Sequence, residues 1–293
     1  MALLNTPMAN RDATVTYLDK FFCRLYVQRM STVRSADGTP IAYTRAGQGP
    51  AVILVDGALS FRAQSINTGL ATALAGDFTV YTYDRRGRGE SGDTPPYTTE
   101  REIEDLAALA AETGGPVRLY GTSSGAALAL AATDAGVPVE KLALYEPPFI
   151  VDDTRPAIPA GYERTLDELV AADRRADAVR YFMRVGVGLP GMAVAMMRFM
   201  PAWSTLKSVA HTLPYDVAFV APYEKGEPYP ESSWPGVKTP TLVMDGAKSR
   251  PWIRNAARSL ADLLPGAEHR TLDGQTHIVK PAALAPVLTE FFH

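Results

Sequence analysis

Short apolar runs alternate with longer amphipathic stretches along this chain, starting near Val33. Apolar runs rich in β-branched and aromatic residues are typical of buried strands, and apolar residues at helical spacing indicate amphipathic helices. Ile253, Ala257 and Leu260, for example, share one helical face. The alternation predicts a parallel sheet covered by helices on both faces.

The pattern predicts an α/β fold with a mostly parallel, eight-stranded sheet. Strands are expected at 33–35, 41–45, 51–55, 78–83, 117–120, 141–145, 241–244 and 269–272. Helices are expected at about 99–112, 124–135, 251–264 and 281–292. Asp37-Gly38, between the first two strands, is a hairpin turn signal.

The alternation of strand and helix breaks between residues 147 and 235. Prolines mark both ends of this segment, and helical patterns lie between them. An insertion at the C-terminal edge of parallel strands commonly covers a ligand site. We therefore expect a core domain of 32–146 and 236–293, a helical cap of 147–235 and an N-terminal extension of 1–31. Within the extension, 18–30 has the pattern of a short amphipathic helix.

The strongest chemical signal is Gly121-Thr122-Ser123-Ser124-Gly125, which directly follows a β-prone run and precedes an alanine-rich helical pattern. Strand, Gly-x-Ser-x-Gly and helix in succession predict a sharp turn that lifts the serine hydroxyl above the sheet. Such a turn is strained and needs glycines on both sides, because larger side chains collide with neighbouring strands. Ser123 is therefore the candidate nucleophile, with the N-terminus of a helix behind it.

Composition excludes several classes of function. The 293 residues are 46% hydrophobic and 21% charged with a net charge of −3, which fits a globular protein without the basic surface of nucleic-acid or anionic-membrane binders. The sequence has no run of 18 apolar residues, so no membrane span is expected. The single cysteine excludes an internal disulfide and fits a reducing compartment, and the four histidines show no metal-ligand spacing. We expect a cytoplasmic monomer or homodimer that acts on a small molecule without metal or cofactor.

Four landmarks make the chain resemble the α/β-hydrolase superfamily, in its branch with a serine nucleophile and a cap. They are the strand that ends in Asp56-Gly57, the turn at 83–91, the Gly-x-Ser-x-Gly turn and the histidine of Gly274-Gln275-Thr276-His277. Family members usually have His-Gly at the first of these. The second closely matches the family turn Asp-x-Arg-Gly-x-Gly-x-Ser, whose arginines brace the loops around the nucleophile. The resemblance runs from Val33 to the C-terminus and implies the α/β-hydrolase fold.

A serine hydroxyl needs a base to take its proton, and an imidazole with an ordinary pKa of about 6.5 suits that task. His277 is the candidate, because it follows the last expected strand in a loop that can bring its ring toward Ser123. Among the other histidines, His269 is interpreted as structural and His293 ends the chain. His211 lies in the cap and is a weaker candidate for lining a pocket.

The acid that orients this histidine is not where the family commonly has it. Ser249 stands where an aspartate is usual, and a serine cannot stabilise an imidazolium as a carboxylate does. Glu146 ends the strand after the helix of 124–135, a strand from which certain haloalkane dehalogenases of the superfamily take their acid. Asp245 is the rival. Asp152, Asp153 or no acid are the remaining alternatives.

Acyl transfer also needs two backbone N–H groups aimed at the developing negative charge. The resemblance places the first on Ser124 and the second on Ala58, in the loop after the strand of 51–55. Asp56, in place of the usual histidine, is expected to hold this loop through a hydrogen bond.

Apolar residues in and next to the cap are the candidates for contact with substrate. They are Leu59, Phe149, Met196 and Trp203. The methionine-rich stretch 191–200 suits irregular apolar space, as ordinary packing or as an adaptable wall. The sequence therefore predicts a carboxylesterase-type serine hydrolase that cleaves an ester or lactone of a small, largely apolar molecule through an acyl-enzyme. The alternative is a non-catalytic or tailoring ligand-binding protein of the same fold.

Overall fold

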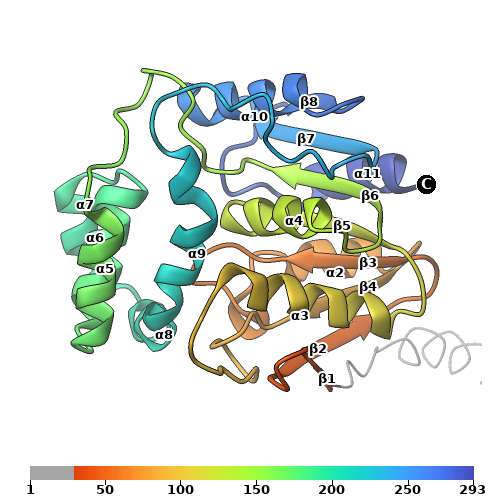
Figure 1. The fold of residues 1–293 in the computed structure, drawn as a ribbon, viewed down its shortest axis with the longest axis horizontal. Helices are drawn as coiled ribbons and strands as arrows, with labels where there is room; N and C mark the ends of the chain where they lie inside the picture. Colours follow the sequence, from red (N-terminus) through yellow and green to blue (C-terminus); the bar gives the residue numbers. More distant parts are fainter. Residues whose placement is uncertain (1–29) are drawn as a thin grey trace, which may run out of the picture.

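The computed structural model describes residues 30–293, and an eight-stranded sheet runs through its centre (Figure 1). The strands are β1 (Ser31–Arg34), β2 (Pro40–Ala46), β3 (Ala51–Val55), β4 (Thr79–Tyr83), β5 (Val117–Thr122), β6 (Val139–Tyr145), β7 (Thr241–Gly246) and β8 (Glu268–Leu272). Their order across the sheet is β1-β2-β4-β3-β5-β6-β7-β8. The pairs β1–β2 and β2–β4 are antiparallel, and all others are parallel. The expected mostly parallel sheet is confirmed.

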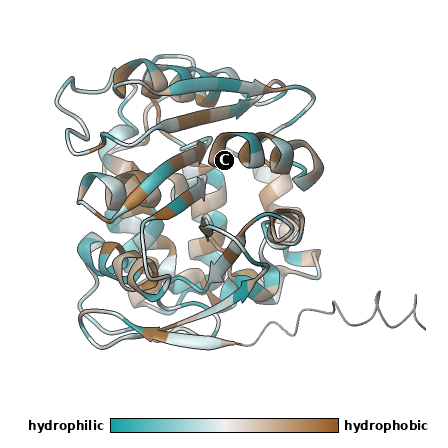
Figure 2. Cartoon of the chain, turned by 90° about the vertical axis from the view of Figure 1, so that its right-hand side faces the viewer, coloured by the Kyte–Doolittle hydropathy of each residue, from teal (hydrophilic) through white to brown (hydrophobic). Residues whose placement is uncertain are grey.

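Helices cover both faces of this sheet (Figure 1). One face carries α3 (Thr99–Glu112), α4 (Ser124–Asp134) and α10 (Pro251–Leu263), and the other carries α2 (Thr68–Leu74) and α11 (Pro281–Phe292). Successive residues of a strand point to opposite faces, so β3 sends Ile53 and Val55 into the first layer and Val52 and Leu54 into the second. In Figure 2, brown marks hydrophobic residues, and it recurs along the strands of the sheet.

The chain between β6 and β7 forms a group of short helices beyond the C-terminal ends of the strands (Figure 1). These are α5 (Tyr162–Ala171), α6 (Arg175–Tyr181), η2 (Phe182–Gly186), α7 (Gly191–Met196), η3 (Met197–Phe199), α8 (Trp203–Ser208), η4 (Ala210–Thr212), α9 (Leu213–Val220) and η5 (Ala221–Tyr223). Leu166, Val179 and Leu213 belong to a separate apolar cluster within this insertion. Helix α9 packs against α4 and joins the insertion to the sheet domain.

The strands and helices expected from sequence form within a few residues of the expected bounds. Asp37-Gly38 makes the turn between β1 and β2, with Gly38 at φ 84°. Two short helices were not expected, α2 and η1 (Arg62–Gln64), because neither is long enough to show a clear helical period. The amphipathic pattern at 18–30 lies outside the described residues, apart from Met30.

Candidate active site

The candidate chemical groups meet at one edge of the sheet because parallel strands end there together. Ser123 directly follows β5 and Glu146 directly follows β6. The last residues of the two strands, Thr122 and Tyr145, pair with each other in the sheet. His277 lies in the loop after β8. Residues 131 positions apart in sequence, Glu146 and His277, are thereby brought into contact.

Ser123 has a strained backbone that projects its side chain above the sheet. Its φ of 56° and ψ of −130° lie in a region that non-glycine residues rarely adopt. The N–H of Ser123 donates to the carbonyl of Tyr145 at 2.9 Å, which holds the turn against β6. Gly125 allows the turn to close, because a Cβ there would lie 2.5 Å from the carbonyl oxygen of Val55. This is the geometry expected of the Gly-x-Ser-x-Gly turn.

Glu146 is fully buried and uses both carboxylate oxygens. Oε1 accepts from the N–H of Gly246 at 2.7 Å, and Oε2 lies 2.7 Å from Nδ1 of His277. Its backbone also has a positive φ, 47°, held by a hydrogen bond from its N–H to the carbonyl of Met244. Because a carboxylate only accepts, Nδ1 of His277 carries the proton and Nε2 is left with a free lone pair.

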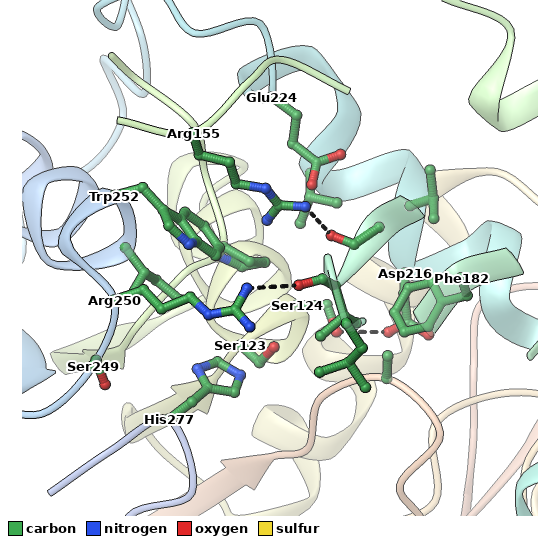
Figure 3. Close-up of a pocket in the computed structure, with 18 of the residues that line it drawn as sticks. Ser123, Ser124, Arg155, Phe182, Asp216, Glu224, Ser249, Arg250, Trp252 and His277 are labelled. Carbon is green, nitrogen blue, oxygen red and sulfur yellow. Dashed lines mark hydrogen bonds between the residues drawn. The ribbon is translucent and has the colours of Figure 1, made fainter. Parts of the chain in front are cut away.

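The loop that carries His277 is fixed at several points. The hydroxyl of Tyr145 donates to the carbonyl of Thr276 at 2.6 Å, and the N–H of Lys248 donates to the carbonyl of Gln275 at 2.8 Å. Gly246 permits this approach, since a Cβ there would lie 2.6 Å from the carbonyl of Gln275. The ring of His277 lies beside Ser123 at the cavity wall, as Figure 3 shows.

Two backbone N–H groups next to Ser123 are suited to bind an anion. Among residues 30–293, neither the N–H of Ala58 nor that of Ser124 has a hydrogen-bond partner. Both residues line the same cavity as Ser123. The N–H of Ser124 also stands at the first turn of α4, where the helix dipole favours negative charge.

A buried ionic network ties this turn to the insertion. The hydroxyl of Ser124 donates to Oδ1 of Asp216, on α9, at 2.8 Å. Asp216 also accepts from Arg85 and Arg88, each at 2.5 Å. Arg88 donates in addition to the carbonyls of Gly57 and Ser60. The arginines of the turn at 83–91 therefore brace the loops around Ser123, as expected.

Two of the aspartates considered from sequence, Asp56 and Asp245, have structural partners. Oδ1 of Asp56 accepts from Ser65 and Asn67, and burial raises the pKa of its carboxyl. Asp245 lies within β7 and contacts Nε2 of His269 at 2.6 Å and Nε of Arg254 at 3.3 Å. Asp245 is therefore engaged away from His277, and His269 has the structural place expected for it.

Ser123 opens into a cavity of about 360 Å³ between the sheet domain and the insertion (Figure 3). Its lining includes Ala58, Ser123, Ser124, Pro148, Arg155, Tyr162, Phe182, Leu189, Asp216, Val217, Val220, Glu224, Ser249, Arg250, Trp252, Ile253 and His277. The walls are largely apolar, with a small number of polar groups, as is usual for small-molecule sites. Sequence reasoning missed Arg155, Tyr162, Glu224 and Trp252, which no spacing or motif brings together.

The four expected substrate contacts lie outside this cavity, which corrects the sequence-based expectation. Leu59 is buried in the apolar cluster of the insertion. Phe149 stacks with Trp234 in an aromatic group, and Met196 is 57% exposed on the outer side of the insertion. Trp203 packs within the insertion beneath the guanidinium of Arg180.

His211, a weaker candidate, lines a different cavity with Tyr97 and Tyr215. Burial lowers the pKa of this histidine, which favours its neutral form. It therefore lies apart from the Ser123 cavity.

Comparison with known proteins identifies the family of this fold. Residues 33–287 match the family model described as the alpha/beta hydrolase family. The chain belongs to the α/β hydrolase family.

Among solved structures, an α/β hydrolase from Sphaerobacter thermophilus is 53% identical, with a TM-score of 0.83 over 90% of this chain and 100% of that one. Two more distant solved structures share the fold. A thermophilic esterase from Thermogutta terrifontis is 22% identical, with a TM-score of 0.63 over 90% of this chain and 98% of that one. An enol-lactonase from Burkholderia xenovorans is 22% identical, with a TM-score of 0.62 over 90% and 99%.

In residues 30–293, no helix is both long and apolar enough to cross a membrane. Within the same residues, no group of three or more histidine, cysteine or acidic side chains is arranged to hold a metal ion.

Proposed function

We propose that this α/β hydrolase cleaves a carboxylic ester or lactone through a covalent acyl-enzyme on Ser123. The single observation that carries the proposal is the 2.7 Å contact between Glu146 Oε2 and His277 Nδ1, with the ring beside Ser123 at the cavity wall. A buried carboxylate that fixes a histidine beside a strained serine is the arrangement required to activate a hydroxyl.

In the first step, Nε2 of His277 takes the proton of the Ser123 hydroxyl while Oγ attacks the carbonyl carbon of the ester. The carbonyl oxygen becomes an oxyanion and accepts from the N–H groups of Ala58 and Ser124. When the C–O bond breaks, the imidazolium returns its proton to the leaving alkoxide. Glu146 stabilises the positive ring throughout without itself becoming protonated.

In the second step, water hydrolyses the acyl-enzyme. His277 takes a proton from the water, whose oxygen attacks the acyl carbonyl, and then protonates Oγ of Ser123 as the acid leaves. A lactone follows the same path, except that its alcohol stays attached to the acyl group and both leave as one hydroxy acid.

Two features support esters and lactones as the substrate class. The cavity of about 360 Å³ suits a small molecule, and its walls are mainly apolar. An esterase and an enol-lactonase are among the proteins that share this fold. A protein that only binds a ligand has no need for a histidine held by a buried carboxylate, which argues against the non-catalytic alternative.

The test is a hydrolysis screen of p-nitrophenyl esters and small lactones with the wild type and with Ser123→Ala. The wild type is expected to hydrolyse short or medium acyl chains, and Ser123→Ala to lose activity by roughly a millionfold or to fall below detection. Ser232→Ala, at an exposed serine outside the cavity, is the matched control. Hydrolysis that persists in Ser123→Ala would overturn the proposal.

A further inference from the structure

One region of the cavity carries buried polar atoms that have no partner in the protein. Tyr162, Glu224 and Trp252 are 2%, 5% and 8% exposed, and all three line the cavity. Among residues 30–293, no hydrogen bond reaches the hydroxyl of Tyr162, Oε2 of Glu224 or Nε1 of Trp252. Buried polar groups without partners are rare, because each loses its hydration without compensation. Three such groups in one region of the cavity indicate that a ligand supplies their partners.

Arg155 completes this part of the wall. Its guanidinium lies 4.5 Å from the ring centre of Trp252, and Nη2 donates to the carbonyls of Val185 and Gly186. These contacts fix the guanidinium in place while leaving its other N–H groups without a partner among the described residues. In Figure 3, Arg155 and Glu224 lie together on the side of the cavity away from Ser123 and His277.

The charges of this region select the kind of group it can bind. A carboxylate bound there would be repelled by the carboxylate of Glu224, and an ammonium group would be repelled by the guanidinium of Arg155. A neutral group that both donates and accepts hydrogen bonds avoids both repulsions. It accepts from Arg155 or from Nε1 of Trp252, and it donates to Glu224. Burial raises the pKa of Glu224 to about 7, because the nearby guanidinium of Arg155 offsets only part of the cost of burying its charge.

We propose that Arg155, Tyr162, Glu224 and Trp252 form a polar subsite that binds a hydroxyl group on the acyl part of the substrate, remote from the carbonyl attacked by Ser123. The hydroxyl donates to Oε2 of Glu224 and accepts from Arg155 or Trp252. The preferred substrates are then esters of hydroxy acids rather than of plain fatty acids. This inference rests on the proposed esterase function, but its binding step can be tested without turnover.

The kinetic test compares p-nitrophenyl esters whose acyl chains of about four to eight carbons end in a methyl, a hydroxymethyl or a carboxylate group, lengths that suit a cavity of this size. The hydroxyl-ended ester of the best length is expected to have a kcat/KM roughly tenfold to a hundredfold above its methyl-ended analogue. In Glu224→Leu this ratio should fall below about threefold. Glu224→Gln should keep part of it, because an amide also donates and accepts.

Two further variants separate the subsite from general damage. Trp252→Phe removes Nε1–H but keeps an aromatic ring for Arg155, and it should lower the ratio severalfold. Glu231→Leu, an exposed residue outside the cavity, should leave the ratio unchanged. Both comparisons use ratios of two substrates, so a partial loss of active protein cancels.

Calorimetry with Ser123→Ala and the methyl esters of the same acids tests binding alone. Tighter binding of the hydroxyl-ended ester, lost in Ser123→Ala/Glu224→Leu, supports the subsite even if no ester is hydrolysed. Absence of hydrolysis for every ester therefore contradicts the proposed function and not the subsite. Equal affinity for hydroxyl-ended and methyl-ended esters, or a preference for the carboxylate-ended one, would overturn the inference.

Discussion

The hydroxyl of Ser124 donates a hydrogen bond of 2.8 Å to Oδ1 of Asp216, across 92 positions of sequence. Ser124 is the first residue of α4 and Asp216 lies on α9, so this bond joins the residue after the candidate nucleophile to the insertion. Its consequence is that the position of the Ser124 N–H depends on the packing of α9. The insertion therefore does more than cover the cavity, since it also holds part of the expected oxyanion site.

Asp216→Asn should destabilise the protein strongly. Asp216 balances Arg85 and Arg88, which are both fully buried, and breaking a buried ion pair costs about 3–5 kcal/mol. Urea unfolding measures this loss. Asp177→Asn is the control, because Asp177 pairs with arginines on an exposed surface and its loss should cost less than about 1 kcal/mol. Equal losses in the two variants would contradict a central role for Asp216.

Glu146→Gln should lower kcat by roughly two to four orders of magnitude for the best ester, because an amide does not stabilise the imidazolium and disturbs the proton on Nδ1. Asp245→Asn is the matched control. It weakens the contacts with His269 and Arg254 and should lower the free energy of unfolding, while kcat of the folded protein stays within about threefold. Steady-state kinetics with both variants check the assignment, and the reverse ranking would transfer the acid to Asp245.

Gly246→Ala should lower kcat/KM by at least roughly tenfold, because the new Cβ collides with the backbone of Gln275 and displaces the loop that carries His277. Gly115→Ala serves as the control, since a Cβ there meets nothing within 4 Å. Kinetics on one ester compare the two variants. Full activity in Gly246→Ala would show that the loop can shift without moving the ring.

The carboxyl of Glu224 should make stability depend on pH. Burial raises its pKa from the ordinary 4.5 to about 7, with Arg155 opposing and Glu163 adding to the shift, while the nearby hydroxyl of Tyr162 stays neutral. The folded protein then holds this proton more tightly than the unfolded chain. The group contributes about 3 kcal/mol below pH 4.5, and this contribution is lost as the pH rises through about 7.

Urea unfolding of the wild type and of Glu224→Gln at several pH values measures this contribution. The free energy of unfolding of the wild type, minus that of the variant, should fall between about pH 5 and about pH 8. A difference that stays constant with pH would contradict a raised pKa for Glu224.

The residues at this edge of the sheet could be predicted because the sequence signals that mark them are local. The Gly-x-Ser-x-Gly turn, the ends of β5 and β6 and the loop after β8 are marked by residues whose backbone requirements are visible in sequence, as for Gly125. Glu146 followed from its place after a strand. Asp245 is one of the last residues of β7, and strand alternation turns its side chain to His269 instead.

The walls of the cavity were not predictable in the same way. Phe149 and Met196 are as apolar as true lining residues, but one packs among aromatic side chains and the other faces outward. Which side of a short cap helix faces the cavity is decided by tertiary packing, which leaves no periodic signal in helices of six or seven residues. Arg155 and Glu224 come from separate loops and meet only in the folded chain.

The most direct measurement is covalent labelling with a fluorophosphonate, followed by mass spectrometry of the digested protein. The account predicts one phosphonyl group on the peptide that contains Ser123, formed by attack of Oγ with loss of fluoride, and no labelling of Ser123→Ala. Folded protein that takes up no label, or takes it up on Ser124, would contradict the account.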